Sequence, residues 1–185
     1  GMGNLCDAYG DHNRALRYYQ KIGSIDHAIS SRSLRLKFKL HMVASLLLLN
    51  RVTAASDLLN ECEELSILVS DKLLTAQILL YQAKVLRAKK RYNEALRCLS
   101  KVQYPANSTQ ASWLATMTRL ELAHCLSAIG KQDYASMILS STDKRVKAYS
   151  SPVLAKRFYD SLSDVCMNQG RFQEALSYEK KGYRI

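Results

Sequence analysis

Small and apolar residues recur along the chain at a fixed step of 40 residues. An alanine marks each period, and a bulky apolar residue follows it by four positions in the first four periods. The five alanines are Ala15, Ala55, Ala95, Ala135 and Ala175. A fixed period of this length indicates a chain of stacked supersecondary units, each of which buries its apolar face against the next.

Other positions keep the same step, and we call each set of residues spaced 40 apart a column. The fifth residue before each alanine is Gly10, Asn50, Lys90, Gly130 or Gly170. Glycine and asparagine suit the positive φ at which many helices end. The ninth residue before each alanine is apolar and the twelfth is mostly small, as a close contact between helices requires. Each period is therefore predicted to be a helix, a tight turn and a second helix.

The pattern predicts helices throughout and no strand. The expected helices span residues 12–29, 33–49, 53–68, 72–88, 92–103, 110–129, 132–141, 152–168 and 171–183. A basic connector is expected at residues 142–151. Ser33 is predicted to cap one helix, and Ser70 with Asp71 another. Pro152 after Ser151 marks a helix start, because proline suits the first helical position.

This unit resembles the tetratricopeptide repeat. The likeness is clearest in residues 163–178, SDVCMNQGRFQEALSY, and in residues 10–19, GDHNRALRYY. The step of 40 exceeds the family's period of about 34, and the family's proline after the second helix is missing. The family's tryptophan position holds Lys39, Leu79, Arg119 and Tyr159. The resemblance implies an all-α, right-handed superhelical solenoid of about five repeats, and it specifies a fold rather than an activity.

Composition fits a single helical-repeat domain over residues 1–185, with 48% apolar residues and only two prolines. The first repeat begins halfway through its first helix, which favours a fragment of a longer chain. The five cysteines are Cys6, Cys62, Cys98, Cys125 and Cys166. They fall at helical positions and are predicted to be reduced packing residues of a cytoplasmic or nuclear protein. The longest apolar run, residues 42–49, is too short to span a bilayer, so no membrane association is expected.

Stacked helix pairs expose the same positions of their first helices on one concave surface, where such arrays bind peptides or partner helices. The groove residues that the family resemblance implies are Leu47, Gln77, Leu80, Lys84, Arg87, Met117, His124, Ser127, Asp164 and Met167. The expected partners are other proteins, with an acidic peptide or helix as one form. The alternative is that the leucines pack against neighbouring repeats and the charges are solvated.

One function of the family is disfavoured. Its co-chaperones hold the tail of heat-shock chaperones with lysines and asparagines at the first two groove columns. The first column here consists of Leu40, Leu80 and Leu120, so the clamp is absent.

The net charge of +11 points to acidic protein surfaces, nucleic acid or anionic lipid as partners. Four successive turns carry a cation and form a predicted basic ridge, consisting of Arg51, Arg91, Lys131 and Arg171. This ridge could meet an acidic helix or a phosphate backbone, or its charges could simply be solvated. Nucleic acid is disfavoured, because Tyr92 and Phe172 belong to the packing pattern rather than to a surface on which bases stack.

Catalytic motifs are missing from the sequence. It has no glycine-rich phosphate loop, no Cys-x-x-Cys pair and no His-Glu-x-x-His motif. His124 and Cys125 are adjacent, which directs them about 100° apart on a helix. Asp160 and Asp164 are one turn apart and could bind a cation, but such pairs usually face solvent. We expect no catalysis, no metal and no cofactor.

Finer resemblances point to large assemblies. Residues 77–102 and 119–139 are similar to stretches near the start of anaphase-promoting complex subunit seven, a cell-cycle scaffold. Residues 10–22, 89–102 and 145–159 are similar to repeat arms of signalosome and proteasome-lid scaffolds. Both imply a non-catalytic protein-binding scaffold in a multi-subunit complex of the ubiquitin pathway. The alternatives are a basic module associated with nucleic acid or regulation, and a self-associating repeat domain.

Overall fold

A computed structural model describes residue 6 and residues 11–23, 31–103, 109–148 and 152–183; for residues 22–23, 109–110, 143–148, 152–154 and 157 it describes the backbone alone. These parts of the chain form helices joined by turns and contain no strand, which confirms the predicted all-α class. In order the helices are α2 (His12–Gly23), α3 (Arg32–Leu48), α4 (Val52–Ile67), α5 (Lys72–Ala88), α6 (Tyr92–Ser100), α7 (Thr109–Ala128), α8 (Gln132–Ala148), α9 (Pro152–Asn168) and α10 (Phe172–Tyr183).

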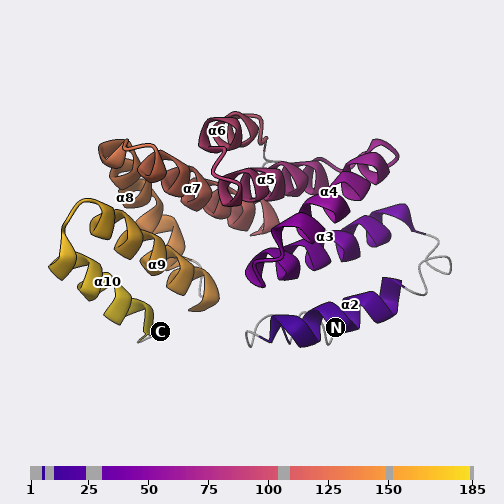
Figure 1. Cartoon of the computed structure of the whole chain (residues 1–185), viewed down its shortest axis with the longest axis horizontal. Helices are drawn as coiled ribbons and strands as arrows, with labels where there is room; N and C mark the ends of the chain where they lie inside the picture. Colours follow the sequence, from indigo (N-terminus) through magenta and orange to yellow (C-terminus); the bar gives the residue numbers. More distant parts are fainter. Residues whose placement is uncertain (1–5, 7–10, 24–30, 104–108, 149–151, 184–185) are drawn as a thin grey trace.

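The helices pack in chain order. Each one contacts the next, and in addition α3 packs against α5, α5 against α7, and α7 against α9. Figure 1 shows the resulting arch, with α2 and α10 at its two ends. Helices α3, α5, α7 and α9 lie on the inner side of this arch, and we call their exposed surface the inner face. Helices α4, α6 and α8 lie on the outer side.

Four turns between helices share one backbone geometry. The residues with positive φ are Asn50, Lys90, Gly130 and Gly170. In each turn the N–H of the following residue bonds to the carbonyl five positions earlier, as in Arg51 to Leu46 at 2.8 Å. This bond closes the first helix in the manner of a Schellman motif. The sequence prediction for this column is confirmed at these four positions, and Gly10 lies outside the described residues.

Most predicted helix ends agree with the structure to within a residue, and two do not. The basic connector predicted at residues 142–151 is wrong, because α8 continues to Ala148. Thr142 is fully buried, and its hydroxyl donates to the carbonyl of Ile138 at 2.7 Å within the helix. Helix α6 ends at Ser100 rather than at residue 103. For the first expected helix, residues 24–29 lie outside the described part of the chain.

The predicted helix caps are partly correct. Asp71 caps α5, since its carboxylate accepts the N–H groups of Leu73 at 2.9 Å and Leu74 at 3.2 Å. The cap of α3 is Ser31 rather than Ser33, and its hydroxyl accepts the N–H of Leu34 at 3.3 Å. The cap therefore lies two residues earlier than the sequence suggested, and the helix begins at Arg32 rather than at residue 33, because either serine could supply the capping oxygen.

The repeated alanines lie in the core. Their exposed fraction is 0% at the first four and 1% at Ala175. Three further small or β-branched residues on inner helices, Val43, Ala83 and Ala123, are also fully buried. Small side chains at these positions let neighbouring helices approach closely, while large ones such as Phe158 fill the remaining space.

Helix α5 joins the two halves of the core. Leu74, Ile78 and Tyr81 belong to the cluster that extends over α3 and α4. Leu80 and Ala83 belong to the cluster that extends over α6 to α9. Because α5 is buried on both sides, the two halves form one continuous packed array.

Four of the five cysteines pack in the core or against it, as expected for packing residues. All five are free, and Cys62, Cys125 and Cys166 are buried. Burial raises the pKa of Cys62 and of Cys125 to about 12, so both stay protonated at neutral pH. Among the described helices, none combines the length and the apolar character needed to cross a bilayer.

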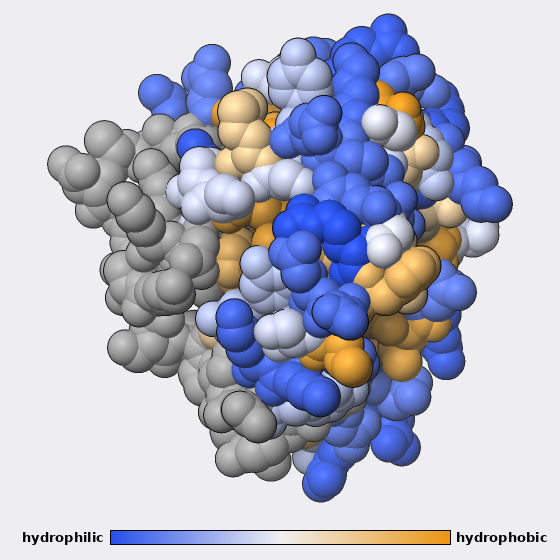
Figure 2. Space-filling view, turned by 90° about the vertical axis from the view of Figure 1, so that its left-hand side faces the viewer, coloured by the Kyte–Doolittle hydropathy of each residue, from blue (hydrophilic) through white to orange (hydrophobic). Residues whose placement is uncertain are grey.

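The end of the arch formed by α8, α9 and α10 is mainly hydrophilic. Figure 2 shows apolar spots on this end that are separated by polar residues, with no continuous apolar surface in that view. Among the described side chains of these three helices, the exposed large apolar ones are Tyr134, Met137, Met167, Phe172, Leu176 and Tyr183.

The turn geometry predicts opposite effects of one substitution at two glycines. Gly130→Ala should lower the free energy of unfolding by about 1 kcal/mol, because φ is +82° there, although an added Cβ would meet no atom within 4 Å. Gly182→Ala should raise it by up to about 1 kcal/mol, because this glycine lies inside α10, where the added Cβ makes an ordinary contact at 3.5 Å with Tyr159. Urea unfolding measures both, and an equal effect of the two changes would contradict the assignment.

Candidate functional site

The inner face carries two adjoining hollows. The α3–α5 hollow has a volume of about 310 Å³ and is lined by Ala44, Leu47, Leu48, Asn50, Val52, Tyr81, Lys84, Arg87, Ala88 and Trp113. The α7–α9 hollow has a volume of about 260 Å³ and is lined by Arg87, Tyr92, His124, Ser127, Ala128, Asp164, Met167 and Asn168. Arg87 lines both, so the hollows form one surface across four successive inner helices.

Two of the predicted groove columns line these hollows. The first consists of Leu47, Arg87, Ser127 and Met167, which are 40 residues apart. The second contributes Lys84, His124 and Asp164 at the same step. The sequence period therefore brings these seven residues together on one face.

The other predicted groove residues do not lie on this surface. Leu80 is 0% and Met117 is 5% exposed, so both belong to the core rather than to a surface that a partner could contact. Gln77 is half-buried and lines neither hollow. The reason is that the inner helices pack directly on one another. The leucine column, Leu40, Leu80 and Leu120, is therefore buried between them.

An ion pair links α5 to α7 at the boundary of the two hollows. The Nε of Arg87 donates to Oε1 of Glu121, whose side chain is only 4% exposed. Burial alone would lower the pKa of Arg87, but the charge and hydrogen bond of Glu121 outweigh it and raise the pKa. Sequence reasoning missed Glu121. The sequence did contain a signal for it. The column of His41, Tyr81, Glu121 and Ser161 is polar and directly follows the column of leucines, which indicates polar side chains close to the contact between inner helices.

Further hydrogen bonds link α7 to α9. His124 Nε2 and Ser161 Oγ lie 3.0 Å apart, and Asn168 Nδ2 donates to Ser127 Oγ at 2.9 Å. Burial, together with the nearby Arg87 cation, lowers the pKa of His124 despite the neighbouring carboxylates. The imidazole is therefore neutral at pH 7, and it serves as a hydrogen-bonding group between helices.

Ser161, His124 and Asp164 have the residue types of a catalytic triad, but their geometry differs from one. His124 Nδ1 lies 4.0 Å from Asp164 Oδ2, beyond hydrogen-bond distance. Ser161 is 2% exposed in the middle of α9, out of reach of a substrate. Backbone N–H groups inside a helix are bonded to carbonyls one turn earlier, so they offer no oxyanion hole. What this arrangement does is hold α7 and α9 together.

The predicted basic ridge lies at the turns, but half of its charge is paired locally. Arg91 binds Glu94 through two bonds of 2.6 Å, and Arg171 binds Glu174 in the same bidentate way. The hydrogen bonds from these arginines lower the pKa of Glu94 and of Glu174.

The other two ridge residues, Arg51 and Lys131, are exposed and have no carboxylate within ion-pair distance in the described chain. Ala54 and Tyr134 occupy the positions at which the other two turns have glutamate. The positive charge of the ridge is therefore weaker and less continuous than its sequence suggests.

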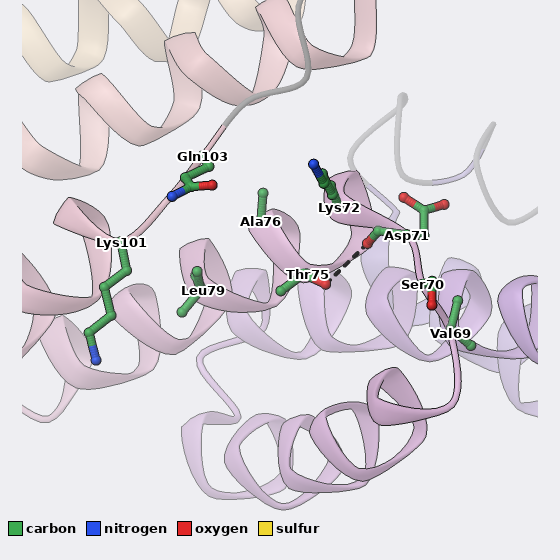
Figure 3. A pocket seen from close by; sticks show the side chains of 9 residues that line it. All are labelled: Val69, Ser70, Asp71, Lys72, Thr75, Ala76, Leu79, Lys101 and Gln103. Carbon is green, nitrogen blue, oxygen red and sulfur yellow. Dashed lines mark hydrogen bonds between the residues drawn. The ribbon is translucent and has the colours of Figure 1, made fainter.

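A third hollow, of about 290 Å³, lies at the start of α5 and the end of α6 (Figure 3). Its polar groups serve the helix itself. The hydroxyl of Thr75 donates to the carbonyl of Asp71 at 3.1 Å, and the Asp71 carboxylate caps α5. Figure 3 also shows the Lys101 side chain pointing away from Lys72 and Asp71. This hollow is thus a consequence of capping rather than a cluster of reactive groups.

The described residues contain no group of three or more His, Cys, Asp or Glu side chains arranged to hold a metal ion. Of the two carboxylates predicted as a cation pair, Asp160 is bonded to Lys156 Nζ at 3.0 Å through both oxygens. Asp164 instead faces the α7–α9 hollow, with its side chain 66% exposed.

Comparison of the chain with protein-family models, with curated proteins and with solved structures gives no match in any of the three. The 40-residue period and the inner face are observed in this chain itself and do not depend on likeness to another protein.

The Arg87–Glu121 pair predicts a stability effect. Arg87→Met should lower the free energy of unfolding by about 2 kcal/mol, because it leaves the Glu121 charge buried without a partner. The effect falls below that of a fully buried pair, since the Arg87 side chain is 39% exposed. Arg97→Met, at an exposed position of α6, should change it by less than about 0.5 kcal/mol. Chemical unfolding that shows equal losses for the two variants would refute the role of the pair.

His124 predicts a pH dependence. Its pKa in the folded chain is below the ordinary value, so at falling pH the unfolded chain binds a proton at this residue before the folded chain does. Stability should therefore decrease as pH falls from about 7 to about 5. The decrease should be smaller in His124→Gln, which cannot titrate. Unfolding free energies of both proteins at each pH measure the difference, and parallel curves would show that His124 does not contribute.

Proposed function

We propose that this protein is a non-catalytic scaffold of the tetratricopeptide-like solenoid class, which binds a segment of a partner protein on its inner face. The main support is the meeting of two 40-residue columns at two adjoining hollows that share Arg87. A column that repeats on successive helices gives an elongated surface, which suits a chain segment better than a compact ligand.

The dimensions support a segment as the ligand. Neighbouring packed helices lie about 8–10 Å apart, so a column with members on four inner helices extends over about 30 Å. An extended peptide of about nine residues or a helix of about 20 residues has this length. The lining also combines apolar side chains with charged and amide groups, as binding surfaces do.

Polar groups at the α7–α9 hollow already bond to other side chains of the chain. This supports the proposal that the protein does not catalyse a reaction. His124, Ser127 and Arg87 each bond to a side chain of a neighbouring inner helix. The narrower proposal, a cytoplasmic or nuclear subunit of a ubiquitin-pathway assembly, rests on the sequence resemblances described above.

Two leucines of α3 provide a matched test. Leu48 is 46% exposed and lines the α3–α5 hollow, whereas Leu34 is 44% exposed and does not. Peptides of about 12 residues, long enough to cross the inner face, are selected from a random display library on the folded chain. Leu48→Asp should weaken binding of the selected peptides at least about tenfold, and Leu34→Asp should leave it within about twofold. Fluorescence anisotropy measures both, with circular dichroism to verify folding.

Two results would reject the proposal. In one, selection yields no peptide that binds the folded chain. In the other, the selected peptides bind Leu48→Asp as tightly as the unchanged protein, which would place their site elsewhere.

A further inference from the structure

The α3–α5 hollow has the features of an anchoring site. Leu47, Leu48, Tyr81 and Trp113 supply an apolar lining from three inner helices. Its volume of about 310 Å³ is at the lower end of the range for pockets that enclose ligands. A single large apolar side chain of a bound segment can therefore be buried there, in the way in which binding energy concentrates on a few anchors.

The lining of this hollow carries cations, and three further cations, which we call its rim, stand next to lining residues in the sequence. Lys84 lines it, with its Nζ 5.7 Å from the centre of the Tyr81 ring, and none of the lining residues carries a carboxylate. Arg51 lies between the lining residues Asn50 and Val52, and Lys89 and Lys90 directly follow the lining residue Ala88. These three side chains are exposed.

Two ion pairs among the described residues reduce the charge of this region only in part. Glu121 pairs with Arg87, and Glu94 pairs with Arg91. Asp57 is exposed on α4, five residues after the lining residue Val52, and is a single carboxylate against the three rim cations. The hollow and its rim therefore keep an excess of positive charge.

The α7–α9 hollow has a different charge. Its one lining cation, Arg87, is paired with Glu121, and the other charged or polar groups include the exposed carboxylate of Asp164, the neutral His124 and the amide of Asn168. The inner face thus changes from positive at α3 and α5 to neutral or negative at α9. A segment that crosses both hollows would be recognised by a matching gradient.

We propose that the segment bound at the α3–α5 hollow is acidic, with one large apolar side chain in the hollow and carboxylates directed to Lys84 and to the turn cations Arg51, Lys89 and Lys90. This inference rests on the proposed function and adds the chemistry of the partner. The Asp164 carboxylate disfavours further acidic residues at the other end, so the gradient also fixes the direction in which the segment lies.

Two lysines of α5 test the charge. Lys84 lines the α3–α5 hollow, whereas Lys72 is exposed at the other end of the same helix. With the selected peptides as probes, Lys84→Glu should weaken binding at least about tenfold and Lys72→Glu less than about twofold. Raising NaCl from about 50 mM to about 300 mM should weaken binding to the unchanged protein several-fold, and binding to Lys84→Glu much less.

The peptides themselves provide the second measurement. The selected sequences should be enriched in Asp and Glu around a large apolar residue, and replacing those acids by Gln and Asn should remove the salt dependence. A single-stranded DNA of about 12 nucleotides carries negative charge without the anchor, and it should bind at least about tenfold more weakly than the peptides.

The possible failures are distinguishable. If Leu48→Asp abolishes binding but the selected peptides are neutral or basic and Lys84→Glu has no effect, the inference about the partner is wrong while the proposed function stands. If Leu48→Asp has no effect, both are wrong. If the DNA binds as tightly as the peptides and with the same dependence on Lys84, charge alone is recognised and the anchored acidic segment is rejected.

Discussion

The close approach of helices at small residues is the constraint on which the rest of this structure depends. An alanine with no more than 1% of its surface exposed recurs in every second helix, and Val43, Ala83 and Ala123 play the same part on the inner helices. Because these side chains are short, α3, α5, α7 and α9 pack directly on one another, and the leucines between them are covered. The neighbouring columns, those of Leu47 and Lys84, remain at the surface and line the hollows.

Much of the fold follows from the sequence, because its signals are local. Pro152 starts α9 and positive φ ends four inner helices, and these positions were identified from residue type and period. The end of α8 was missed, because the basic residues after Thr142 read as a connector although lysine, arginine and alanine favour helix. Ser31 and Ser33 are equivalent as capping residues in sequence, so the choice between them depends on how α3 packs.

The site was predictable where it depends on the period and not where it depends on how far one helix is displaced against the next. The residues of the Leu47 and Lys84 columns lie together at the two hollows. Leu80 and Met117 share that period but point into the space between helices, which the sequence does not specify. Glu121 was missed because a buried acid and its arginine are 34 residues apart and meet only through tertiary packing.

The cross-links between inner helices differ along the arch, and this affects its mechanics. Arg87–Glu121, His124–Ser161 and Asn168–Ser127 are hydrogen-bonded pairs, which tolerate little change in angle or distance. Helices α3 and α5 share an apolar cluster that includes Leu40, Val43 and Ile78, and contacts of this kind have no preferred direction. The hydrogen-bonded pairs therefore restrain α5, α7 and α9 against sliding or turning on one another, so the curvature of the arch along these three helices is held by directional bonds in addition to apolar contact.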